Sequence, residues 1–116
     1  MYDIKFTVIS GGDWSEIIEA IDDDTNEPLT DIDTGTIQLQ VQSPSGGVML
    51  NLSTADSTIT RPASGQFQWV VATASLGSFC TGQTYHVGCR HINESGGTTA
   101  LFTGSLAYVD GGYEWR

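Results

Sequence analysis

Short runs of alternating apolar and polar residues recur along this chain from Lys5 to Val109, and they constrain its fold more than any other feature. The clearest run is Thr36–Gln42, in which isoleucine, leucine and valine alternate with threonine and glutamine. Successive side chains of a β-strand point to opposite faces of a sheet, so this pattern predicts a strand with one buried face and one wet face. Turns rich in glycine, serine and aspartate separate the runs, and no long helical pattern interrupts them. We therefore expect an all-β fold of two packed layers.

The alternating runs predict seven to nine short strands in a single domain that spans residues 1–116. Residues 14–20 also fit a short helix, but the β-branched side chains of the run 14–21 and the aspartates that follow favour a strand. Residues 73–77 predict one helical turn, with Thr73 as its N-cap. Strands this short and closely spaced favour an antiparallel β-sandwich. The expected strands begin at Ile4, Trp14, Thr36, Val48, Thr58, Gln66, Tyr85 and Thr98.

The charge of the chain excludes two classes of direct partner. The formal net charge is −10, with only four basic residues, and ten of the fourteen acidic residues fall within residues 1–33. Binding to nucleic acid or to an anionic membrane needs clustered lysine and arginine, so we exclude both. No stretch approaches the roughly 20 apolar residues of a membrane-spanning helix, and the chain does not open on a signal-peptide pattern. We expect synthesis in the cytoplasm.

The acidic segment 22–33 contains a partial calcium-binding pattern. Asp22, Asp24 and Asn26 fall at positions 1, 3 and 5 of an EF-hand-like loop, and Asp33 falls at position 12. The pattern fails at position 6, where Glu27 stands in place of the glycine that the turn needs. Three interpretations remain, which are a solvated acidic face, a calcium site and a face for a basic partner. The candidate partner-binding residues here are Asp22, Asp23, Asp24, Glu27, Asp31 and Asp33.

The cysteines and histidines show no zinc-binding or catalytic spacing. Cys80 and Cys89 are separated by eight residues, and the chain has no second pair of cysteines to complete a zinc site. His86 and His91 fall on opposite faces of one expected strand. Nothing in the sequence indicates secretion, so we expect free thiols, with Cys89 packed inward. No serine or carboxylate stands at a spacing that implies a triad or a tuned acid–base pair. We expect neither enzymatic activity nor a cofactor.

The aromatic residues allow two further interpretations. A row of exposed tryptophans would suit a sugar-binding platform, but Trp69 alternates with Phe67, which favours a place in the core. Tyr113 and Trp115 are separated by one residue and lie beyond the last expected strand. This pair either packs over its own domain or inserts into a neighbouring subunit. Tyr113 and Trp115 are therefore candidate partner-binding residues as well.

A series of short motifs keeps its order and spacing over about a hundred residues. In order, the motifs are Gly12-Asp13-Trp14, residues 31–35, residues 37–41, residues 43–46, residues 50–54, Ile59, Gly65, Thr73 with Leu76, Gly82 with Tyr85, and residues 101–104. In this arrangement the chain resembles small immunoglobulin-like structural proteins encoded among the virion genes of tailed bacteriophages and prophages. The N-terminal domains of phage baseplate upper proteins are similar. Residues 77–81 depart from the pattern by lengthening one connection.

The resemblance implies an immunoglobulin-like sandwich with a non-enzymatic structural role in the virion. Such a module bridges or decorates other virion proteins and associates with copies of itself. The tail, baseplate or neck is the expected place, and capsid decoration is the alternative. Hypotheses from another class stay open, namely a carbohydrate-binding or calcium-dependent adhesion module that contacts the host surface.

Overall fold

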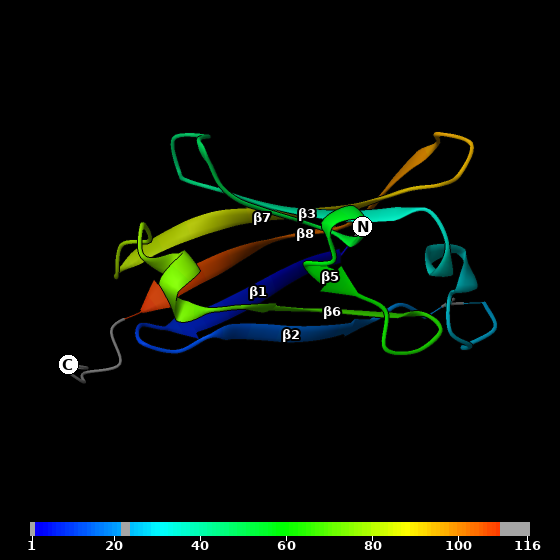
Figure 1. Ribbon diagram of the computed structural model, residues 1–116, viewed down its shortest axis with the longest axis horizontal. Helices are drawn as coiled ribbons and strands as arrows, with labels where there is room; N and C mark the ends of the chain where they lie inside the picture. Colours follow the sequence, from blue (N-terminus) through cyan, green and yellow to red (C-terminus); the bar gives the residue numbers. More distant parts are fainter. Residues whose placement is uncertain (1, 22–23, 110–116) are drawn as a thin grey trace.

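Two packed β-sheets make up the structure, a computed structural model that describes residues 2–21 and 24–109 (Figure 1). The larger sheet has the strand order β1-β8-β7-β3-β4, and the smaller sheet has the order β2-β6-β5. The eight strands of the described ranges confirm the expected all-β sandwich. They are β1 (Tyr2–Ile9), β2 (Trp14–Glu19), β3 (Thr36–Gln42), β4 (Val48–Ser53), β5 (Ile59–Thr60), β6 (Gln66–Val71), β7 (Gln83–Ile92) and β8 (Thr98–Val109).

The distribution of strands between the sheets is immunoglobulin-like. β2, β6 and β5 correspond to strands B, E and D of such domains, while β3, β4, β7 and β8 correspond to C, C′, F and G. The connection from β6 to β7 also carries the tyrosine corner of this fold. The hydroxyl of Tyr85, at the start of β7, accepts a hydrogen bond of 2.7 Å from the backbone N–H of Cys80. This bond fixes the loop that precedes the central strand of the larger sheet.

One strand pair differs from the antiparallel arrangement that we predicted. β1 runs parallel to β8, in register from Tyr2 opposite Phe102 to Ile9 opposite Val109. The turn after β1 leads into β2, which belongs to the other sheet, so β1 occupies the edge of the larger sheet beside the last strand. Alternation of side chains reports which face of a strand is buried but not the direction of its neighbour, so the pattern could not distinguish the two pairings.

Aromatic side chains from both sheets meet in the centre of the sandwich. Phe6 of β1 packs edge-on against Trp14 of β2 and Trp69 of β6, with ring centroids 5.6 and 6.0 Å apart. The two tryptophans contact each other at 5.3 Å, and Phe102 of β8 extends the cluster on the other side of Phe6. Edge-to-face pairs of this kind add to the stabilisation that burial alone provides. The prediction that Trp69 belongs to the core is confirmed.

Strand parity follows the sequence closely in β2 and β3. Trp14 is buried on β2 whereas Ile17 is 60% exposed, which agrees with the strand and not with the helical alternative for this segment. In β3, Ile37, Leu39 and Val41 all face the core. The polar glutamines of β3 therefore point outward from the larger sheet.

Within residues 2–21 and 24–109, three short 3-10 helices join the strands, and the one at residues 73–77 was expected. They are η1 (Thr30–Asp33), η2 (Thr54–Asp56) and η3 (Thr73–Leu76). The prediction that Thr73 caps η3 with its own side chain is wrong, because Ala72 holds the N-cap position. The backbone N–H of Thr73 instead donates a hydrogen bond of 2.8 Å to the Oδ1 atom of Asp13, in the turn between β1 and β2. A residue distant in sequence thus satisfies this helix end.

Candidate functional site

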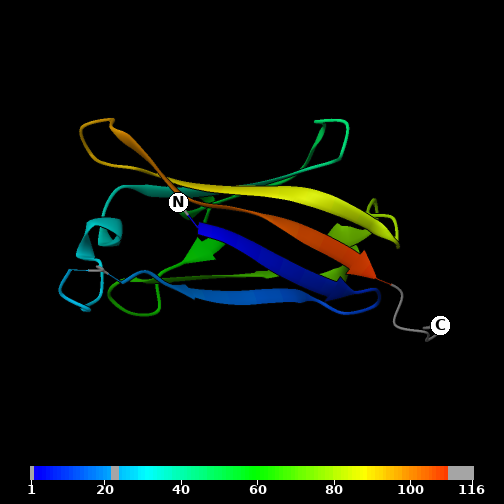
Figure 2. The ribbon, with the colours of Figure 1, turned by 180° about the vertical axis from the view of Figure 1, so that it is seen from behind.

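The outer face of the larger sheet forms a cradle between two projecting hairpins. The β3–β4 and β7–β8 hairpins both bend away from the smaller sheet (Figures 1 and 2). Each contains a shift in strand register, between Val41 and Gln42 in one and between Cys89 and Arg90 in the other. Irregularities of this kind bend and twist a strand pair, which accounts for the outward turn of both hairpins.

The tips of the two hairpins are built in the same way. The backbone N–H groups of Ser43 and Asn93 donate to the carbonyl oxygens of Gly47 and Gly97, at 2.7 and 2.8 Å. The side chains of Ser43 and Asn93 in turn accept hydrogen bonds from those same glycine N–H groups, at 3.0 and 2.8 Å. The two turns share this bonding pattern, so we infer that both tips hold their shape independently of a partner.

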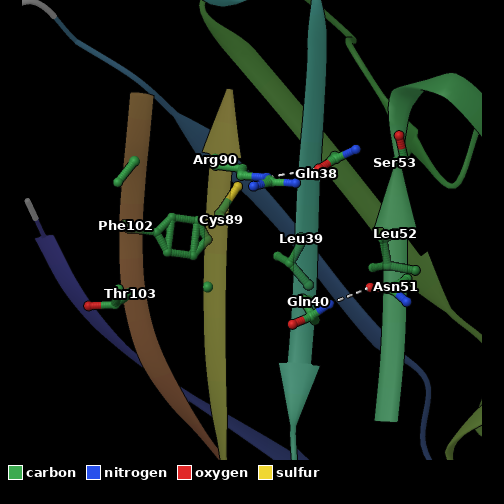
Figure 3. A pocket seen from close by; sticks show the side chains of 12 residues that line it. Gln38, Leu39, Gln40, Asn51, Leu52, Ser53, Cys89, Arg90, Phe102 and Thr103 are labelled. Atoms are coloured by element: carbon green, nitrogen blue, oxygen red, sulfur yellow. Dashed lines mark hydrogen bonds between the residues drawn. The ribbon is translucent and has the colours of Figure 1, made fainter. Parts of the chain in front are cut away.

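A hollow lies at the centre of the cradle, where the cavity measures about 490 Å³ (Figure 3). Gly88 of β7 creates it, because a Cβ atom placed there would have no neighbour within 4 Å. Gly88 is opposite Gln40 on β3 and opposite Thr103 on β8. The polar residues that line the hollow are Gln38, Gln40, Asn51, Ser53, Arg90 and Thr103.

Hydrogen bonds orient the amide side chains of this lining. Nε2 of Gln40 donates to Oδ1 of Asn51 at 3.0 Å, and Nε of Arg90 donates to Oε1 of Gln38 at 2.8 Å (Figure 3). Nε2 of Gln42 continues the series by donating to Oε1 of Gln40 at 2.5 Å. Pre-ordered amides lose less conformational entropy when they bind a ligand, so the surface is suited to hydrogen bonding with a polar partner.

The lining carries little charge although the chain as a whole is strongly acidic. Among the described residues of the lining, Arg90 is the one that carries a charge. Burial raises the pKa of the Cys89 thiol to about 12 and keeps that group neutral. Amide and hydroxyl groups donate and accept hydrogen bonds, and the guanidinium donates them. The arrangement therefore favours recognition of a neutral or weakly acidic polar surface.

Sequence reasoning found the polar side of β3 but missed the hollow. Gly88 lies inside a strand, and a glycine at such a position often marks a bulge or a close approach of another backbone. A glycine inside the strand-like run Tyr85–His91 was therefore a signal in the sequence. It could not show which residues of the adjacent strands would surround Gly88.

The acidic segment is fixed to the sandwich through Asp33, at the end of η1. Its Oδ1 accepts a hydrogen bond of 2.8 Å from the N–H of Gly65, and its Oδ2 accepts one of 2.5 Å from the hydroxyl of Ser64. Gly65 has a φ of +74°, and a Cβ atom there would lie 2.7 Å from Cβ of Pro28. The chain therefore passes very close to the acidic segment at this glycine. Asp33 consequently has a structural role.

Arg61 and His91 bind carbonyl groups in the last turn of η1 and in the residues just after it. Nε of Arg61 donates to the carbonyl oxygen of Ile32 at 2.8 Å, and its guanidinium also donates to that of Gly35 at 2.8 Å. Nε2 of the buried His91 lies 2.6 Å from the carbonyl oxygen of Thr34. His86 is exposed on the opposite face of the same strand, which confirms the predicted parity.

The hydrogen bonds of Asp33 make folding sensitive to acid. The Ser64 hydroxyl, and secondarily the Gly65 N–H, hold the pKa of the Asp33 carboxyl below its usual value of 3.8. Because the unfolded chain binds this proton more readily, the contribution is complete above about pH 5 and is lost as pH falls through the lowered pKa. We expect Asp33→Asn to reduce the slope of unfolding free energy against pH on the acid side.

Urea denaturation of both proteins between about pH 2 and pH 7 measures that slope. Asp31→Asn, on the same 3-10 turn, is the charge-matched control and should retain the wild-type slope. Equal slopes for all three proteins would contradict the role assigned to Asp33.

The remaining candidates of the acidic segment are exposed or lie outside the described residues. Asp24, Asn26, Glu27 and Asp31 are exposed, and Asn26 has a φ of +57°. Within the described ranges, no three histidine, cysteine, aspartate or glutamate side chains gather as they would around a metal ion. The calcium hypothesis stays a prediction. The candidates outside the described residues are Asp22, Asp23, Tyr113 and Trp115.

The two cysteines are free, as expected. Cys89 is buried in the core, whereas Cys80 is exposed in the loop before β7. The aromatic side chains that the structure describes do not form an exposed row, because those of Trp14, Phe67, Trp69 and Tyr108 are all buried. The sugar-platform interpretation therefore has no aromatic surface in residues 24–109.

Comparison with known proteins adds no family to this description. A scan against protein-family models found no matching family, and a search of curated proteins found no match. In the part of the chain that the structure describes, every helix is too short or too polar to cross a membrane.

Proposed function

We propose that this protein is a non-enzymatic, immunoglobulin-like structural module of a tailed bacteriophage virion, which bridges or decorates other virion proteins in the tail, baseplate or neck. The cradle on the larger sheet carries the proposal. It offers ordered hydrogen-bonding side chains on a rigid sheet between two stiff hairpins, an arrangement that suits docking of another protein. The resemblance of the motif order to that of phage immunoglobulin-like proteins supports the proposed place in a virion.

The proposed partner surface is polar and weakly charged. Arg90 and the amides of β3 and β4 match exposed backbone groups or the polar side chains of a partner protein. The acidic segment lies at one end of the sandwich, beyond the start of β3, so it leaves the cradle accessible (Figure 1). Copies of the chain and other virion proteins are thus the expected partners, without nucleic acid or membrane.

A variant that fills the hollow tests this function. Gly88→Gln adds a neutral side chain where a Cβ atom has open space, so the fold should persist while the cradle is blocked. Purified wild-type protein should be incorporated into phage particles that lack it, and Gly88→Gln should be incorporated at least about tenfold less, as expected for loss of an interface hot spot. Thr7→Gln, exposed on β1 and outside the hollow, is the matched control.

Mass spectrometry of separated heads and tails measures the incorporation. Recovery with tails supports the proposed location, whereas recovery with heads would assign the protein to capsid decoration. A protein found only in the host cytoplasm and never in particles would overturn the virion role. Binding to host polysaccharide that Gly88→Gln abolishes would replace the structural role by the adhesion hypothesis.

A further inference from the structure

A second groove opens on the side of the sandwich where the two sheets are not joined. β2 forms the outer edge of the smaller sheet, and none of the described strands pairs with that edge. β1 and β2 separate towards the end of the sandwich that carries the acidic segment, as both views show (Figures 1 and 2). At that end a cavity of about 680 Å³ lies between the end of β2 and the beginnings of β1 and β8. We call it the open-edge groove.

The lining of the open-edge groove is mainly apolar. The buried rings of Phe67 and Phe102 belong to it. Further lining comes from apolar side chains that pack on the core but remain only partly covered. These are Ile4, Ile18, Ala20, Leu29 and Leu101. Apolar surface left uncovered beside an unpaired strand edge is the type of site that an added strand fills.

The sequence contains a segment with the matching chemistry. Tyr113 and Trp115 stand two positions apart, so in an extended conformation both side chains point to the same face, with Glu114 on the other. Large aromatic residues are the commonest anchors of protein interfaces. Arg116 adds a positive charge next to a groove whose lining includes Asp3 and Glu19.

The segment cannot reach the groove of its own chain. Phe102, the groove residue of β8 that is nearest to the strand end, precedes Val109 by seven residues, or about 23 Å along a strand. Tyr113 follows Val109 by only four residues, which span at most about 14 Å when fully extended. β8 ends at the opposite end of the sandwich from the acidic segment (Figures 1 and 2). Tyr113 and Trp115 can therefore both be inserted only in the groove of another molecule.

We propose that the open-edge groove binds segment 110–116 of a second copy of this chain, with Tyr113 and Trp115 inserted and Glu114 facing water. The segment lies along the free edge of β2 and extends the smaller sheet. Each copy then presents a groove at one end and a segment at the other, so copies associate head to tail. Such a heterologous contact closes into a ring or continues as a filament, depending on the rotation between copies.

This inference adds a self-assembly contact to the proposed structural role and rests on that role only for its biological purpose. The test uses the isolated full-length chain, so its outcome is separate from incorporation into particles. A chain that stays monomeric would overturn the head-to-tail contact and leave the virion role intact. A chain that self-associates but never enters particles would overturn the virion role and leave the head-to-tail contact intact.

The experiment uses one variant that disables the segment and one that disables the groove. Trp115→Ala removes an anchor, and Ile21→Asp places a charge at a groove residue that is 44% exposed and therefore tolerant of substitution. Val48→Asp, which replaces a 52% exposed apolar residue on the β3–β4 hairpin, is the matched control. Circular dichroism verifies that every variant is folded.

Sedimentation velocity over a range of concentrations measures association. Wild type and Val48→Asp should form larger species as concentration rises, whereas Trp115→Ala and Ile21→Asp alone should associate at least about tenfold more weakly. A mixture of those two variants should form a one-to-one dimer, because one intact groove and one intact segment remain. The proposal is overturned by a monomeric wild type, by variants that associate as wild type does, or by a mixture that stays monomeric.

Discussion

Replacement of Gly104 by alanine should separate β1 from β8 and lower the free energy of unfolding by about 3 kcal/mol. Gly104 stands opposite Ile4 in the parallel pair, and a Cβ atom there would lie 2.0 Å from the carbonyl oxygen of Ile4. The obstacle is backbone, so a change of rotamer cannot relieve it. β1 has to move, and Phe6 at the centre of the aromatic cluster moves with it.

The same substitution at Gly88 is the matched control, and we expect it to change the free energy of unfolding in the opposite direction. Gly88 lies on the neighbouring strand with open space around its Cβ position, so Gly88→Ala should raise stability by about 0.5–1 kcal/mol. Urea denaturation monitored by tryptophan fluorescence measures both changes. If the two variants had equal stabilities, the close approach of β1 to β8 would be wrong.

Truncation of Trp69 should have the largest effect among core substitutions, because its ring contacts both sheets. Trp69 is 1% exposed and packs against Phe6, Trp14 and Phe67. Trp69→Ala removes these contacts and leaves a cavity, at an expected cost of about 3–5 kcal/mol in unfolding free energy. A domain of this size has only about 5–15 kcal/mol in total, so the variant should unfold at a much lower urea concentration.

Two further substitutions show which part of Trp69 matters. The indole nitrogen has no hydrogen-bond partner among the described residues, so Trp69→Phe should cost clearly less than Trp69→Ala. Val70, the next residue along β6, is 61% exposed, and Val70→Ala should change stability by less than about 0.5 kcal/mol. Equal losses at Trp69 and Val70 would contradict the assignment of faces on β6.

Much of the fold was predictable because local patterns record burial. The alternation in β3 correctly assigned every side chain to a face, and glycine-rich turns placed the strand ends. The local sequence of a strand does not show which other strand it pairs with. The parallel contact of β1 with β8 joins residues a hundred positions apart, and only Gly104 hinted that a backbone passes close to β8.

The candidate site was less predictable than the fold. The outward glutamines of β3 followed from parity, but their partners Asn51 and Arg90 depend on strand register. The cradle also depends on two register shifts, which bend its hairpins and leave no clear local pattern. In the acidic segment, the spacing of carboxylates suggested a calcium ligand at Asp33, whereas its hydrogen bonds to Ser64 and Gly65 become visible only when distant loops meet.

The parallel pairing of β1 and β8 also determines how the sandwich responds to tension. All eight residues of β1 are in register with β8, and the beginning of β1 and the end of β8 lie far apart along the strands. A pulling force between these two points runs along both strands and loads their evenly spaced hydrogen bonds in shear. The bonds must then rupture together instead of opening one after another. Pulled in this direction, the pair should resist separation more than a pair of strands that opens from one end.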